Sequence, residues 1–273
     1  MLDNSVLAGE VLRHGAYICL RLSAGTDSRA AAAVAIPALA EKLGLENEFA
    51  SAAGAPAQSI AFLRRHDVTP GAIDDEGLAH ADAVVHVAAP KAQPVDDFCR
   101  EAARRLGSVA RLRVLGGVVR PRTYTGAAMN NFAYAHQVVQ QPGRVMPNAF
   151  LIPMSKTAGW WAKDWMERHT YFLPRYDDDG RMKSEGHALA SAAGIACLLR
   201  RTYKSPTEPA PDGAYDFVTY FECADADVPT FHQVCASLRD VARNPEWKFV
   251  REGPTWRGRR VATWPDLFTE RSA

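Results

Sequence analysis

The chain has 273 residues, of which 47% are hydrophobic and 23% charged, as in an ordinary globular protein. Its 32 lysines and arginines nearly balance its 31 acidic residues, which leaves a formal net charge of +1. This balance excludes the basic excess that nucleic acid or an anionic membrane surface requires, and no apolar run reaches the roughly 20 residues of a bilayer span.

The N-terminal sequence MLDNSVLAGEVLRHG lacks the basic start and the apolar run of a signal peptide. The five cysteines are widely spaced and include no CxxC pair, so neither a zinc site nor a disulfide framework is predicted. We therefore expect a protein of the reducing cytoplasm whose partner is a small-molecule substrate, with no role for nucleic acid or membrane.

The first half of the chain predicts six elements in the order β-α-β-β-α-β. Apolar alternation or a continuous apolar run predicts strands over residues 16–24, 59–66, 82–90 and 109–119. Alanine-rich composition and helical spacing of apolar residues predict helices over Ala30–Leu43 and Val95–Leu106.

A segment rich in Pro, Gly, Asn and Gln, roughly residues 121–148, predicts a linker. After it the same order of elements returns. The predicted strands cover 149–154, 197–203, 215–222 and parts of 247–261. One or two helices are expected within 157–194, interrupted by a turn from Pro174 to Gly180, and another helix over Val228–Val241.

This repeated order predicts an α+β fold of two tandem ferredoxin-like halves, a domain over 1–120 and a second over 149–273 joined by the linker. Their sheets are expected to face each other or to close into a barrel. Fingerprints for dinucleotide binding, a P-loop or a nucleophile elbow are absent from the sequence. The acidic run Asp177–Asp179 lacks the spaced ligands of a calcium loop and is expected to be a solvated turn.

Several strings in the second half point to a known family. They are IPMSKTAGWW (152–161), LLRRTYKS (198–205), YDFVTYFECAD (215–225), FHQVCASLRDV (231–241) and REGPTWRG (251–258), with a weaker match at VLGGVVRPRTY (114–124). Together they resemble the chlorite dismutase-like haem proteins. That family of dimeric α+β barrels includes coproheme decarboxylases and is related to dye-decolorising peroxidases.

The resemblance implies haem b, iron protoporphyrin IX, in the second half and no cofactor in the first, in a chain that forms homo-oligomers. One axial histidine would bind the iron. His187 lies 13 residues before Arg200, the spacing that the family shows between its ligand and an arginine. Its neighbours along a helix, Ala190, Ser191 and Gly194, are small enough to admit a flat macrocycle. The alternative ligand is His169.

The neighbours of His169, namely Trp165, Met166 and Phe172, would crowd a porphyrin and are expected to fill the core. Its local letters, ERHT, nevertheless resemble the family's ligand segment, so both histidines stay open.

Arg200 matches the arginine that this family places over the open face of the iron. A guanidinium is always charged and donates hydrogen bonds in a fixed fork, which suits an oxyanion. Adjacent strand residues point to opposite faces, so Arg201 should point away from the pocket, and an Arg201→Ala change should not affect turnover.

By position, Lys156, Trp160 and Tyr124 match residues that hold the haem propionates in this family. An ammonium group and an indole N–H are suitable donors for carboxylates. Without the match, Lys156 would be an ordinary solvated strand end. Phe217, Thr219 and Phe221 share a strand face, and they line the pocket or, as we expect, form sheet core.

The chain departs from the family at two places. Where relatives carry a glutamate that accepts a hydrogen bond from the axial histidine, the gapless match is Arg243; Glu246 replaces it only if the NPEW turn shifts the helix end. Extra residues, including YFLPRYDDDGR, precede the His187 region. Both departures weaken the case for chlorite as the substrate.

Three functions follow from the resemblance. The first is a haem-dependent oxidoreductase acting on chlorite or peroxide. The second is a coproheme decarboxylase-like or biosynthetic haem enzyme that uses tyrosines such as Tyr124 or Tyr134. The third is a haem-binding protein without catalytic activity, or a barrel that has lost haem.

Overall fold

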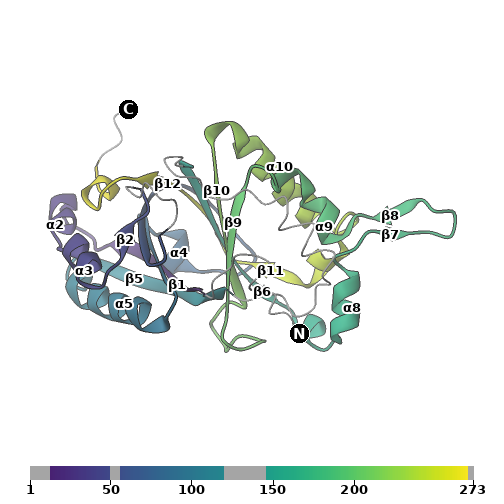
Figure 1. Cartoon of the computed structure of the whole chain (residues 1–273), viewed down its shortest axis with the longest axis horizontal. Coiled ribbons are helices and arrows are strands. Elements are labelled where there is room, and N and C mark those ends of the chain that lie inside the picture. Colours follow the sequence, from purple (N-terminus) through teal and green to yellow (C-terminus); the bar gives the residue numbers. More distant parts are fainter. Residues whose placement is uncertain (1–12, 50–55, 120–145, 270–273) are drawn as a thin grey trace.

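The structure is a computed structural model that describes residues 13–49, 56–119 and 146–269. Two β-α-β-β-α-β halves share one large sheet, with helices on its outer side (Figure 1). Within the described ranges, no helix has both the length and the apolar character needed to cross a membrane.

The first half contains the four predicted strands, which pair antiparallel in the ferredoxin-like order β5-β1-β4-β3. They are β1 (Arg13–Leu22), β3 (Ser59–Thr69), β4 (Ala83–Ala89) and β5 (Ala110–Val119). The predicted helix before β5 is α5 (Ala92–Leu106). Two short elements were not predicted: β2 (Glu46–Asn47), which pairs parallel with β3, and α4 (Glu76–Ala79).

The prediction of one helix over Ala30–Leu43 was wrong. The segment forms two helices, α2 (Ser28–Ala32) and α3 (Ile36–Lys42). Pro37 lies in the first turn of α3, where its missing N–H is harmless, whereas inside a continuous helix it would break the hydrogen-bond ladder.

The second half repeats the arrangement, with its strands in the order β9-β10-β6-β12. They are β6 (Asn148–Lys156), β9 (Leu199–Lys204), β10 (Phe217–Cys223) and β12 (Thr255–Val261), and the short β11 (Val250–Glu252) also pairs with β6. The predicted helix after β10 is α10 (Val228–Arg239), preceded by the 3-10 turn η2 (Asp225–Asp227).

Between β6 and β9 the chain forms several short pieces, in place of the one or two helices predicted there. These are α7 (Ala158–Trp161), α8 (Trp165–Thr170), α9 (Gly186–Ala190) and the 3-10 turn η1 (Ala192–Gly194). The predicted turn at Pro174–Gly180 is the end of a hairpin, β7 (Arg175–Tyr176) and β8 (Met182–Ser184), which projects from the body in Figure 1. Asp178 and Asp179 are exposed there, as predicted.

Residues after Asn244 do not begin with a strand as predicted. The 3-10 turn η3 (Pro245–Phe249) comes first, with Pro245 in its first turn, and β11 starts only at Val250. The last described element is the 3-10 turn η4 (Pro265–Leu267). Most of the predicted linker lies outside the described residues.

The shared sheet closes on itself. β12 pairs with β3 over seven residue positions from Thr255 to Val261, β9 meets β5 at Val118 and Lys204, and β10 pairs with β6. The α+β prediction with ferredoxin-like halves is therefore confirmed, and the sheets form a closed barrel.

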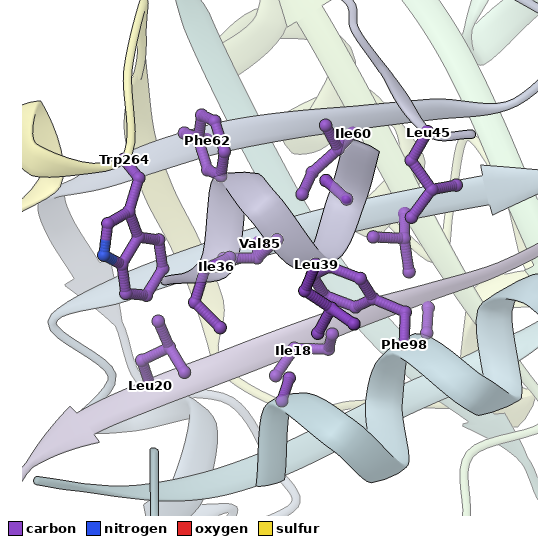
Figure 2. Close-up of a cluster of buried hydrophobic side chains, with 14 of the residues drawn as sticks. Ile18, Leu20, Ile36, Leu39, Leu45, Ile60, Phe62, Val85, Phe98 and Trp264 are labelled. Carbon is purple, nitrogen blue, oxygen red and sulfur yellow. The ribbon is translucent and has the colours of Figure 1, made fainter. Parts of the chain in front are cut away.

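Strand alternation separates an inner from an outer core. On the outer face of the first half, α3 and α5 cover apolar strand side chains that include Ile18, Phe62 and Val85, and Phe98 of α5 packs against them (Figure 2). The barrel interior holds aromatic and small apolar residues instead, with Tyr17, Tyr203, Tyr220 and Trp256 fully or almost fully buried.

One end of the barrel interior also contains a buried ion network. Arg260 contacts Glu222 at 2.6 Å and Glu48 at 3.3 Å, while Arg201 lies 3.8 Å from Glu48. Burial alone would raise the pKa of Glu48, but Arg201 and its other neighbours lower it to about 2. Removing Arg201 would leave a buried carboxylate short of a partner, so Arg201→Ala is not the silent change expected from strand alternation alone.

Candidate functional site

A cavity lies between the outer face of the second half-sheet and the helical segments of α9 and α10. Its sheet side comes from alternate residues of β9 and β10, which pair as Arg200 with Phe221, Thr202 with Thr219, and Lys204 with Phe217. Beyond these strand residues the lining consists mainly of apolar and small residues: Ala188, Ser191, Gly194, Ile195, Leu198, Val234, Leu238, Trp247 and Val250. Met154, Lys156, Phe172, His187 and Glu246 complete the lining.

His187 enters this cavity from the first turn of α9. The preceding Gly186 has φ +65°, and a Cβ there would lie 2.4 Å from the carbonyl oxygen of Leu173, so only glycine fits. The His187 amide donates to the carbonyl of Tyr171 at 3.2 Å. Of the small residues expected beside His187, Ser191 and Gly194 line the cavity, whereas Ala190, the last residue of α9, is buried in the hydrophobic core instead.

Glu246 connects His187 to Lys156. Its Oε2 lies 2.9 Å from Nδ1 of His187, and its Oε1 accepts a hydrogen bond from the Lys156 ammonium group. Burial by itself would raise the pKa of Glu246, but Lys156 and His187 outweigh it and hold the pKa well below its usual value. An ionised carboxylate only accepts, so His187 carries a proton on Nδ1, and in the neutral form of the ring Nε2 is then the nitrogen with the lone pair.

Lys156 is buried, not solvated as a strand end would be. It is 8% exposed, its backbone N–H donates to Asp216 at 2.6 Å, and its ammonium nitrogen lies 4.2 Å from the Trp160 ring centroid. Its contact with Glu246 assigns it a role at the histidine that the sequence did not predict.

We expect Lys156→Met to destabilise the protein by about 3–5 kcal/mol, because it leaves the buried Glu246 carboxylate without its cation. Guanidinium denaturation at pH 7 measures the change. The double variant Lys156→Met with Glu246→Gln should recover part of the loss, since no buried charge is then left unpaired. An equal loss in the double variant would contradict this explanation.

Arg200 lines the sheet side of the same cavity, and Arg201 faces the barrel interior. The strand register predicted for these two residues is thus correct. Phe217, Thr219 and Phe221 all line the cavity, while Phe221 also belongs to the hydrophobic core of this half and Phe217 packs against it, so both expected roles are found. The same two-residue alternation places Thr202 and Lys204 on the face of Arg200, and both line the cavity although they were not among the predicted site residues.

The remaining candidates lie elsewhere. His169 is on α8 and is not among the cavity-lining residues. Of its neighbours expected to fill the core, Phe172 is buried as predicted, whereas Trp165 and Met166 are 63% and 61% exposed. Trp160 is fully buried against Tyr171 and Phe172, next to the cavity and beneath Lys156. Tyr124 lies outside the described residues.

Arg243 does not occupy the position of the histidine's hydrogen-bond partner. Because α10 ends at Arg239 and η3 follows, Glu246 reaches His187 while Arg243 pairs with Glu185 at the surface. The departure expected from the gapless match is therefore removed by the shifted helix end.

The residues of this cavity fit a haem. A histidine held by a carboxylate on Nδ1 presents Nε2 as a metal ligand, and the lining joins flat apolar surfaces to small residues. The buried hydroxyl of Thr202 finds no hydrogen-bond partner among the described residues. Arg200 and Lys204 bring two cationic groups to the sheet side of the cavity, and the Lys204 ammonium group also lies 3.6 Å from Glu208.

No model of a known protein family and no curated protein matches the chain. Solved structures do. A mutant chlorite dismutase from Candidatus Nitrospira defluvii is 19% identical with a TM-score of 0.67. A second mutant of that enzyme, in complex with cyanide, is 18% identical with a TM-score of 0.67.

The same organism's chlorite dismutase in complex with imidazole is 19% identical with a TM-score of 0.66, and each of the three alignments covers 97% of both chains. At this identity the likeness shows the fold. The resemblance of the sequence motifs to the chlorite dismutase-like proteins is thereby confirmed for the fold.

Proposed function

We propose that this chain, which has the fold of chlorite dismutases, is a haem-dependent oxidoreductase that acts on chlorite or peroxide. The observation that carries the proposal is the placement of His187, Glu246 and Arg200 around one cavity. The haem, which we take to be haem b, would occupy the second half of the chain and leave the first half without cofactor.

When bound, haem supplies a redox-active iron with one position open to substrate. Nε2 of His187 would bind the iron from the helix side. Glu246 accepts a hydrogen bond from Nδ1–H, fixes the ring orientation and would make the imidazole a stronger electron donor, while Lys156 keeps Glu246 ionised.

Arg200 would bind the substrate anion from the sheet side. Its fixed fork of N–H donors can hold two oxygens of one anion and stabilise charge that develops on the outer oxygen as a Cl–O or O–O bond breaks. The apolar lining around Phe217 and Phe221 limits access of water, which strengthens the interaction between guanidinium and anion.

The setting of the enzyme is part of the same proposal. All five cysteines are free thiols, which supports a reducing compartment such as the cytoplasm. We also propose a homo-oligomer, in keeping with the resemblance.

Glu246→Gln tests the electronic role of the carboxylate. A neutral amide gives the His187 imidazole less anionic character, so ferric iron is stabilised less and the reduction potential should rise. Spectroelectrochemistry of the haem-loaded protein measures the shift. An unchanged potential would show that the carboxylate does not act on the iron through His187.

The function itself is tested with an oxygen electrode and a peroxidase assay on the haem-loaded protein. Sustained oxygen release on addition of chlorite supports chlorite as substrate, and oxidation of an electron donor with peroxide supports the peroxidase form. A stable haem complex inactive in both assays would contradict the proposal and favour the biosynthetic or carrier functions.

A further inference from the structure

The segment that carries His187 is fastened to the segment that carries Glu246 by a second set of contacts. Nε and Nη2 of Arg243 donate to the two carboxylate oxygens of Glu185 at 2.9 and 3.0 Å. The backbone amides of Glu185 and Gly186 donate to the carbonyl oxygen of Arg243 at 2.8 and 3.0 Å. Four hydrogen bonds thus join one short stretch to the other.

These hydrogen bonds join two segments, one directly before His187 and one shortly before Glu246. Glu185 and Gly186 directly precede His187, and Arg243 lies in the loop that leads into η3 with Glu246. Neither segment is held by a long element, because α9 has only five residues and the loop after Arg239 is irregular up to Pro245. Together with the hydrogen bonds that His187 and Asn244 make to Tyr171 and Leu238, the four hydrogen bonds between the segments set the distance from Nδ1 to the Glu246 carboxylate.

We infer that Arg243 and Glu185 form a clamp that positions His187 against Glu246. The two are positioning residues, since they touch neither the cavity nor a reacting group. The consequence for the iron rests on the proposed function, but the clamp itself is a property of the protein without haem. Gly186 completes it, because its positive φ turns the chain from the clamp into α9.

If the Arg243–Glu185 pair only stabilised the fold, its loss would lower the free energy of unfolding. Arg243 is 47% exposed and Glu185 25%, and ion pairs at such exposure contribute little to the free energy of unfolding. A bidentate pair still restricts orientation, since two parallel hydrogen bonds fix the angle as well as the distance. We therefore expect the clamp to affect the geometry at His187 more than global stability.

The test follows the Nδ1 proton of His187 in the full chain, ¹⁵N-labelled at histidine, before haem is added. Its resonance is identified by its disappearance in Glu246→Gln. In Arg243→Ala this proton should exchange with solvent roughly tenfold faster, the factor that corresponds to a loss of about 1.4 kcal/mol of local restraint. Arg243→Lys should restore only part of the protection, because an ammonium group cannot form the fork.

Arg239→Ala is the matched control. Arg239 also makes a bidentate pair, with Glu252 at 2.8 and 3.1 Å, and is similarly placed near the end of α10. It should leave the His187 proton unchanged. The charge-reversed double variant Glu185→Arg with Arg243→Glu should restore protection, which separates the ion pair from the effect of either side chain alone.

Unchanged exchange in Arg243→Ala, or equal acceleration in Arg239→Ala, would overturn the clamp. The outcome is independent of whether haem binds: a protein that shows the predicted exchange pattern but takes up no haem would retain the clamp and refute the proposed function. In haem-loaded protein the same Arg243→Ala change should raise the reduction potential in the direction of Glu246→Gln, by a smaller amount.

Discussion

His187→Ala is expected to abolish stoichiometric retention of haem. The imidazole is the only histidine ring that lines the cavity among the described residues, and its loss would remove the proposed bond from protein to iron. The apolar walls would still bind haem weakly, as they bind any flat hydrophobic molecule. Gel filtration after reconstitution, with the Soret absorbance per polypeptide as readout, measures retention.

His169→Ala provides the comparison. His169 lies on α8 away from the cavity lining, so its removal should leave both the Soret maximum and the stoichiometry as in the unaltered protein. The reverse pattern would transfer the ligand to His169. Neither change should unfold the chain, because each removes one polar side chain and leaves the core intact.

Arg200→Ala is expected to slow the reaction with chlorite or peroxide by about a hundredfold, or about 2.7 kcal/mol, as for other single preorganised donors. It should also weaken the binding of cyanide and fluoride, because the cavity loses the guanidinium that we propose binds the anion. Stopped-flow kinetics and ligand titration of the haem-loaded variant measure the two effects.

Arg200→Lys should recover only part of the rate, since a point charge does not reproduce the fork of the guanidinium. Arg251→Ala, at an exposed position on β11, controls for the loss of an arginine as such. Arg201→Ala is unsuitable as a control, because it disturbs the buried network around Glu48. Full activity in Arg200→Ala would refute an anionic substrate held from the sheet side.

The strands were predictable because their signal is local. Two-residue alternation in β9 and β10 assigns Arg200 and Arg201 to opposite faces without any knowledge of the tertiary structure. The prediction of one helix over Ala30–Leu43 was wrong for a reason that is also visible in the sequence. Pro37 interrupts the segment, and the prediction relied on alanine content alone.

The connection between Lys156, Glu246 and His187 was not predictable in the same way. Lys156 ends a strand, and Glu246 lies 90 residues later in a 3-10 turn, so their contact depends on how β6 and η3 meet. A gapless comparison selected Arg243, because it extended α10 past the point where the helix ends at Arg239. Periodicity locates the faces of regular elements but not the side chains of irregular turns.

The most direct test of axial ligation by His187 is a haem titration of His187→Gly in the presence and absence of free imidazole. The glycine variant leaves room for a ligand supplied from solution. We predict that it forms no wild-type Soret band with haem b alone, and that added imidazole restores that band at one haem per chain. A wild-type spectrum without imidazole would contradict the assignment of His187 as the ligand of the iron.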